Sequence, residues 1–106
     1  MNSFAPDSYP VTELSLRPLE TCAQLFLENV QLTTLAKQFG TPLYVYSENT
    51  LLNAWQSWQY PTHERKIHVC YAVKACSNLH ILRLFAEQGA FFDTVSEGEI
   101  ARALAA

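Results

Sequence analysis

Residues 67–75, with the sequence IHVCYAVKA, decide the fold of this chain. The stretch has no glycine or proline and is rich in β-branched and aromatic residues, so it predicts a β-strand. Side chains alternate between the faces of a strand, which puts the bulky members on one face and Lys74, with small or polar neighbours, on the other. The bulky members are Ile67, Val69, Tyr71 and Val73. Because both faces are largely apolar, the pattern is typical of a parallel strand covered on two sides.

The sequence after this strand alternates between helical and strand patterns. Ser77 can cap a helix that Gly89 ends. The buried stripe predicted for that helix is Leu79, Leu82, Phe85 and Ala86. Residues 90–95 then predict a second strand, and Ser96 with Glu99 forms a capping box that opens a second helix. The order strand, helix, strand, helix predicts a parallel α/β sheet with right-handed crossovers.

The sequence before residue 67 predicts a leader followed by short elements. Residues 1–24 are polar and contain three prolines, so we expect a loosely ordered segment there. Three elements are predicted after it: a short strand over residues 25–27, a helix over residues 32–39 that Gly40 ends, and a strand over residues 43–46.

A longer helix is predicted directly after these elements. Ser47 can cap it, and Tyr60-Pro61 is expected to end it. Its apolar stripe contains Leu51, Trp55 and Trp58. We interpret both tryptophans as core residues that pack against a sheet, in preference to a role in binding a ligand.

Composition and charge exclude several classes of protein. The chain has 106 residues, 49% hydrophobic and 16% charged, with a formal net charge of -3, which is ordinary globular composition. No run of Lys or Arg indicates a nucleic-acid or anionic-membrane partner. No apolar stretch is long enough to span a bilayer, and the first ten residues do not resemble a signal peptide. The three cysteines have no metal-ligand spacing, so we expect no metal site in a reduced, cytoplasmic protein.

Lys74 is the residue most suited to chemistry. Active sites of parallel α/β proteins lie at the carboxyl ends of strands, where Lys74 falls, and the small Ala72 on the same face leaves room for a bulky group. A lysine in such a place can attack an aldehyde such as that of pyridoxal phosphate (PLP), whose ring then acts as an electron sink. By position alone, however, a lysine that reaches solvent at a strand end is the preferred interpretation.

Two carboxylates are the next candidates. Asp93 lies within the second predicted strand, and adjacent parallel strands can bring it near Lys74; a solvated acid at a strand end is an equally weighted alternative. Glu99 has a sufficient local role in the capping box, so any further role has no support from position.

Three motifs carry a resemblance to a known family. Residues 71–75, YAVKA, followed by SNL at 77–79, resemble the cofactor-lysine motif of the alanine-racemase-fold PLP-dependent decarboxylases. The sequence GAFFDTVSEGE at residues 89–99 is similar to the second motif of that family. GTPLYVY at residues 40–46 resembles the segment that precedes the barrel in the diaminopimelate decarboxylase branch. The resemblance covers roughly residues 25–106.

The resemblance implies a fold and a cofactor. Family members have a TIM-like (β/α)8 barrel that binds PLP and a separate β-domain, and they form homodimers. Residues 25–46 would then be associated with the β-domain, and residues 47–106 would be the first βα units of an incomplete barrel. The resemblance further implies that Lys74 is the Schiff-base lysine, that Asp93 lies beside the cofactor, and that Glu99 lies near the same pocket.

The reaction implied by the resemblance is decarboxylation of meso-2,6-diaminopimelate to L-lysine and carbon dioxide. Related decarboxylases that act on ornithine, arginine or carboxynorspermidine are an alternative, and so is a catalytically dead fragment that binds a full-length relative. Cys76 and Glu97 depart from the family pattern, which often has Asn and Gly there. Because the phosphate-binding loop lies downstream in the family, we expect the 106-residue chain to be truncated and inactive alone.

Overall fold

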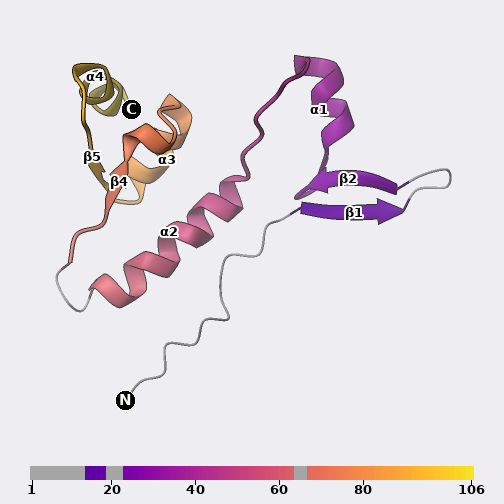
Figure 1. The fold of residues 1–106 in the computed structure, drawn as a ribbon. Helices are drawn as coiled ribbons and strands as arrows, with labels where there is room; N and C mark the ends of the chain where they lie inside the picture. The colour runs from indigo at the N-terminus through magenta and orange to yellow at the C-terminus, as the bar shows by residue number, and fades with distance from the viewer. Residues whose placement is uncertain (1–13, 19–22, 64–66) are drawn as a thin grey trace. The chain divides into compact units, whose positions relative to one another are not determined.

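A computed structural model describes residues 14–18, 23–63 and 67–106 of the chain (Figure 1). The chain divides into two compact units, Met1–Ala54 and Trp55–Ala106. Each unit is described by itself below.

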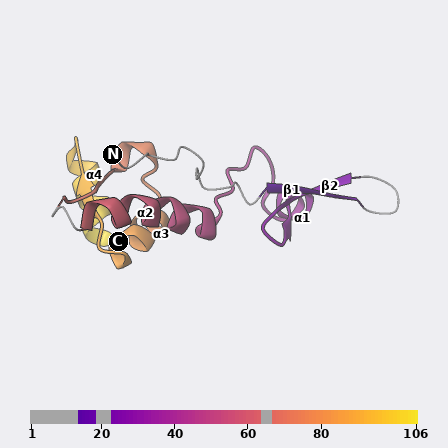
Figure 2. The same ribbon diagram turned by 90° about the horizontal axis from the view of Figure 1, so that it is seen from below.

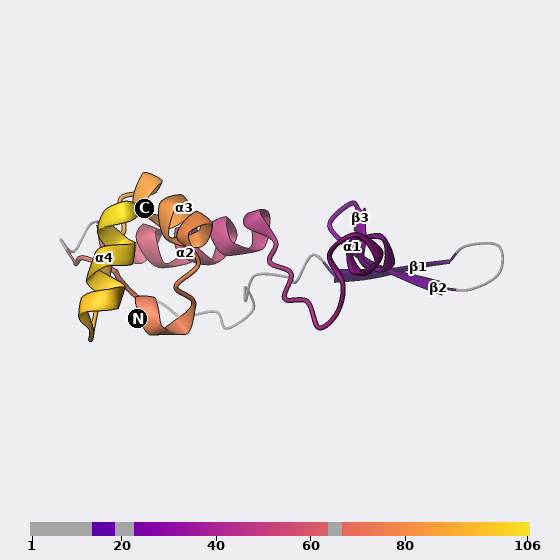
Figure 3. The same cartoon turned by 90° about the horizontal axis from the view of Figure 1, so that it is seen from above.

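The first unit contains a three-stranded antiparallel sheet in the order β1-β2-β3. The strands are β1 (Leu14–Pro18), β2 (Ala23–Leu27) and β3 (Val30–Gln31). The helix α1 (Leu32–Phe39) follows and packs against β2 and β3, beside the hairpin in Figures 2 and 3. It ends at Gly40, which has a φ of 82° and donates its N–H to the Ala36 carbonyl at 2.9 Å. The predicted strand at 25–27, the predicted helix and its glycine stop are confirmed.

Two predictions for this unit are wrong. Leu14–Pro18 is an ordered strand rather than part of a loose leader, because it pairs along its whole length with β2 and Arg17 lies over the Phe26 ring at 4.6 Å. The two strands form a hairpin in which Pro18 pairs with Ala23, and the polar, proline-containing composition of residues 1–24 does not indicate that pairing. Residues 43–46 form no strand and are exposed, with Tyr44 87% exposed, because no strand of the described chain pairs with them. The residues before Leu14 lie outside the described part.

The long helix α2 (Glu48–His63) begins in the first unit and ends in the second. The predicted cap is confirmed, since the Ser47 hydroxyl accepts a hydrogen bond from the Thr50 N–H at 3.0 Å. The predicted stop at Tyr60-Pro61 is wrong, because a proline near a helix end removes only one backbone donor and the helix continues to His63.

The second unit confirms the predicted order of strand, helix, strand, helix. The strands β4 (Cys70–Ala72) and β5 (Phe91–Asp93) are parallel, and they alternate with the helices α3 (Leu79–Glu87) and α4 (Glu97–Ala105), which pack on each other. The core consists of Trp55, Val73, Ile81, Leu82 and Phe85. This is a mixed α/β arrangement whose two described parallel strands do not close a barrel.

Several boundaries and packing roles in this unit differ from the predictions. The strand predicted over residues 67–75 is limited to Cys70–Ala72, and a 3₁₀ turn, η1 (Val73–Ala75), follows it. The residue that caps α3 is Asn78, whose side chain accepts the His80 N–H at 2.9 Å, and not Ser77. In the buried stripe of α3, Ile81 takes the place predicted for Leu79 and Ala86, which are exposed. Trp55 is buried as predicted, whereas Trp58 is 64% exposed.

Candidate active site around Lys74

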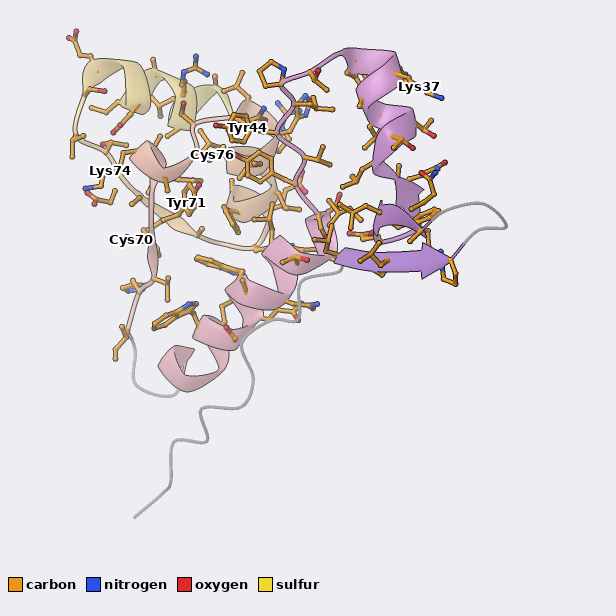
Figure 4. The ribbon with its side chains drawn as sticks, turned by 45° about the vertical axis from the view of Figure 1, so that its right-hand side comes forward. Lys37, Tyr44, Cys70, Tyr71, Lys74 and Cys76 are labelled. Atoms are coloured by element: carbon orange, nitrogen blue, oxygen red, sulfur yellow. The ribbon has the colours of Figure 1, made fainter. Side chains whose placement is uncertain are left out.

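The turn η1 places Lys74 just beyond the carboxyl end of β4. Val73 is fully buried at 0% exposure, and its side chain anchors the turn in the core. Lys74 is exposed, and Figure 4 shows it pointing outward from the turn. The buried Val73 and the exposed Lys74 differ in the sense that the alternation predicted, but both belong to a 3₁₀ turn, so the strand predicted for these two residues is wrong.

The surroundings of Lys74 leave its amine open to a reaction partner. In the described part of the chain, Lys74 makes no hydrogen bond or ion pair with another residue. A primary amine in that situation can add to an aldehyde, which is the chemistry that attaches PLP to a protein. The turn therefore fits the aldehyde end of PLP. The described residues show no comparable set of donors for its phosphate group.

A hydrogen bond spans the turn on its inner side. The Tyr71 hydroxyl donates to the Cys76 carbonyl at 3.1 Å, and the Tyr71 ring lies against Phe85 at 4.6 Å and Phe92 at 6.3 Å between centroids. Burial raises the pKa of the Tyr71 phenol above its ordinary value of 10.0, and an ionised Cys76 thiol adds to this effect. The sequence pattern did not indicate this bond, because it depends on a turn that was predicted as continuous strand.

Asp93 lies at the same edge of the two-stranded sheet as the turn. It is the last residue of β5 and pairs in register with Ala72, two residues before Lys74. The side chain is exposed and is not ion-paired with Lys74 within the described residues. The sheet thus brings the two predicted site residues to one edge and leaves both without a partner from the described chain.

Glu99 has the local role that the sequence predicted. Its Oε2 accepts the Val95 N–H at 2.7 Å, and its own N–H donates to the Ser96 hydroxyl at 3.2 Å. The carboxylate reaches one residue farther back than in the usual capping box, where it binds the N–H of the cap residue itself. The structure therefore explains Glu99 as part of the start of α4.

A further contact that the sequence pattern did not indicate involves Arg102 on α4. Its Nη1 donates to the Ser77 carbonyl at 3.2 Å, which ties α4 to the segment after the Lys74 turn.

The described residues contain no group of three side chains suited to hold a metal ion. Within the same residues, no helix has the length and apolar character needed to cross a membrane.

Comparison with known proteins gives one consistent family. The model of the pyridoxal-dependent decarboxylase family, pyridoxal binding domain, matches residues 48–106. Diaminopimelate decarboxylase of Haemophilus influenzae is 46% identical over 83 residues, which are 78% of this chain and 20% of that protein. The enzyme of the same name from Neisseria meningitidis serogroup A is 52% identical over 82 residues, which are 77% of this chain and 20% of that protein.

Solved structures agree with the sequence comparison. A crystal structure of a protein from Aquifex aeolicus superimposes with a TM-score of 0.79 and 40% identity, over 88% of this chain and 22% of that one. Diaminopimelate decarboxylase from M. jannaschii, solved in complex with L-lysine, superimposes with a TM-score of 0.74 and 32% identity, over 87% of this chain and 22% of that one.

The chain thus spans about a fifth of the length of the curated relatives that it matches. The family match covers more than half of the chain and includes Lys74, Asp93 and Glu99. On these grounds the chain belongs to the pyridoxal-dependent decarboxylase family, within the pyridoxal binding domain, and is similar there to diaminopimelate decarboxylases.

Proposed function

We propose that Lys74 is the residue that attaches PLP in a decarboxylase that converts meso-2,6-diaminopimelate to L-lysine and carbon dioxide. The observation that carries the proposal is the open amine of Lys74 at the carboxyl end of a parallel strand, inside the segment that matches the family model. The relatives named diaminopimelate decarboxylase support this substrate over ornithine or arginine.

Within this proposal, the residues of the chain hold and orient the reacting groups. PLP, when bound, supplies an electron sink for the carbon that loses carbon dioxide. The Lys74 amine holds the cofactor by its aldehyde carbon, and buried Val73 fixes the backbone beneath that amine. The Asp93 carboxylate, at the same sheet edge, can accept a hydrogen bond or a proton beside the cofactor. Glu99 supports the pocket indirectly by fixing the start of α4.

The proposal extends to domain organisation and assembly. Residues 25–46 belong with a β-domain, residues 47–106 begin a (β/α)8 barrel, and the complete enzyme is a homodimer. We expect no turnover by the 106-residue chain alone, because its two described parallel strands leave the sheet edges unpaired and Lys74 open to water.

The test joins this chain to the rest of a relative. Residues 25–106 replace the matching segment of the Neisseria meningitidis serogroup A enzyme, and the product is called the joined protein. We expect it to release carbon dioxide from meso-2,6-diaminopimelate. Lys74→Ala should lower the rate by about a thousandfold or more, as the loss of a covalent catalytic group does. The matched control is Lys37→Ala, which removes an exposed lysine on α1 and should leave the rate unchanged.

Two results would contradict the proposal. A Lys74→Ala protein that keeps the rate of the joined protein removes Lys74 from the reaction. A joined protein that decarboxylates ornithine or arginine in preference to diaminopimelate contradicts the substrate and leaves the family assignment in place.

A further inference from the structure

Tyr71 and Cys76 flank the turn that carries Lys74. We infer that Tyr71 is a positioning residue. The hydrogen bond from its hydroxyl to the Cys76 carbonyl holds the turn so that the Lys74 amine stays at the carboxyl end of β4. The inference rests on the proposed function, since it concerns how the same lysine is presented to the cofactor.

The bond closes a small loop around Lys74. It joins a side chain in β4 to the backbone just after η1, at a distance of 3.1 Å. Inside that loop, Val73 points into the core and Lys74 points to solvent, and Figure 4 shows Tyr71 and Cys76 on the side of the turn away from the Lys74 amine. The backbone is therefore held on its inner side while the amine stays free on its outer side.

The Tyr71 side chain is itself held in place by packing. The Tyr71 ring contacts Phe85 of α3 and Phe92 of β5, with centroid distances of 4.6 and 6.3 Å. A tyrosine has few rotatable bonds, so this packing leaves its hydroxyl little freedom. The hydroxyl must keep its proton to donate the bond, as a phenol does at neutral pH, and burial raises the pKa of Tyr71 further above that range.

The segment after the turn is held from the other direction. Arg102 binds the Ser77 carbonyl at 3.2 Å, and Asn78 caps α3. These contacts fix residues 77 and 78, and buried Val73 holds the middle of the turn, so the Tyr71 bond is the restraint that holds Cys76, at the end of the turn. Losing one neutral hydrogen bond of this kind makes local opening about two- to tenfold more frequent. The fraction of molecules with the lysine in place falls accordingly, and the apparent affinity for the cofactor falls with that fraction.

The first arm of the test uses the full 106-residue chain without cofactor. Tyr71→Phe keeps the packed ring and removes only the hydroxyl. The control is Tyr44→Phe, which removes the same atom from a side chain that is 87% exposed. Amide hydrogen exchange, read by mass spectrometry, should become about two- to tenfold faster across residues 73–76 in Tyr71→Phe, with α3 and the control unchanged.

The pattern of exchange distinguishes positioning from general support. Unchanged exchange at residues 73–76 would overturn the inference. An equal increase over the turn, α3 and β5, or loss of the helical circular dichroism signal, would also overturn it, because the hydroxyl would then stabilise the whole unit and not the turn.

The second arm uses the joined protein and PLP. Tyr71→Phe should raise the apparent dissociation constant for PLP about two- to tenfold, measured by the quenching of tryptophan fluorescence. An unchanged constant would overturn the inference even if the turn is looser. If the joined protein with Tyr71 intact takes up no PLP at Lys74, the proposed function fails, and the exchange arm still decides whether Tyr71 holds the turn.

Discussion

Phe85 is the residue on which the packing behind the Lys74 turn depends, so its removal gives the sharpest test of the structure. The side chain is 5% exposed and contacts Trp55 at 5.6 Å and Tyr71 at 4.6 Å between centroids. It joins α2, α3 and β4 within the second unit. Phe85→Ala removes the ring from that cluster and leaves a cavity, because the surrounding elements collapse only partly.

The magnitude follows from burial and from measured core truncations. An aromatic side chain buries about 150–250 Å², which at roughly 25 cal/mol per Å² corresponds to about 4–6 kcal/mol as an upper estimate. Truncations of buried phenylalanine cost about 3–5 kcal/mol. A unit of half this chain's length has a free energy of unfolding of only about 3–8 kcal/mol, at roughly 0.05–0.15 kcal/mol per residue. We therefore expect Phe85→Ala to leave the second unit largely unfolded.

The assay is a urea titration of the 106-residue chain followed by tryptophan fluorescence. Trp55 contacts Phe85 and reports the core, whereas Trp58, in the same helix, is 64% exposed. The matched control is Phe91→Ala, the same change at a side chain that is 52% exposed, with an expected cost of about 1 kcal/mol or less. A Phe85→Ala chain as stable as the Phe91→Ala chain would refute this account of the core.

Three further predictions concern local contacts. Glu28, with a φ of 54°, has a carboxylate that accepts hydrogen bonds from residues at the start of α2. In urea titrations, Glu28→Ala should therefore lower the free energy of unfolding by about 0.5–2 kcal/mol. The control Glu48→Ala should change it little. Ser96→Ala should cost about 0.5–2 kcal/mol through the lost cap of α4, whereas Ser77→Ala, which removes no cap, should cost under about 0.5 kcal/mol; equal losses would contradict the observed caps. The raised pKa of Tyr71 contributes stability that is fully present below pH 10.0 and is lost as the pH rises through the folded-state pKa. The midpoint of thermal unfolding should therefore fall in strong alkali. In Tyr71→Phe, which has no phenol to ionise, the midpoint should fall less.

The sequence predicted the fold best where local patterns and pairing agree. The alternating pattern gave the correct difference in burial between Val73 and Lys74, although Ile67 on the same predicted face as Val73 is 53% exposed. The predicted cap of α4 by the Ser96 side chain is confirmed. Glycine at position 40, with its positive φ, marked the end of α1 correctly. In each case the signal lies within a few residues of the element that it controls.

The predictions failed where the outcome depends on pairing between segments or on the exact backbone conformation, which the local composition does not show. The strand Leu14–Pro18 exists because β2 pairs with it, and residues 43–46 form no strand because no strand of the described chain pairs with them. At the candidate site, the position of Lys74 after a parallel strand and its exposed side chain agree with the sequence analysis, and its role as the cofactor lysine stays a prediction. The bond from Tyr71 to Cys76 was not predictable, because it requires the 3₁₀ turn that ends the strand early.

The most direct test of the central claim is to locate the cofactor on the chain. The joined protein is loaded with PLP, reduced with borohydride, digested and mapped by mass spectrometry. We predict a phosphopyridoxyl group on Lys74, at about one per chain, with Lys37 and Lys66 unmodified. A group on another lysine, or equal labelling of all three, would contradict the assignment of Lys74 as the cofactor lysine.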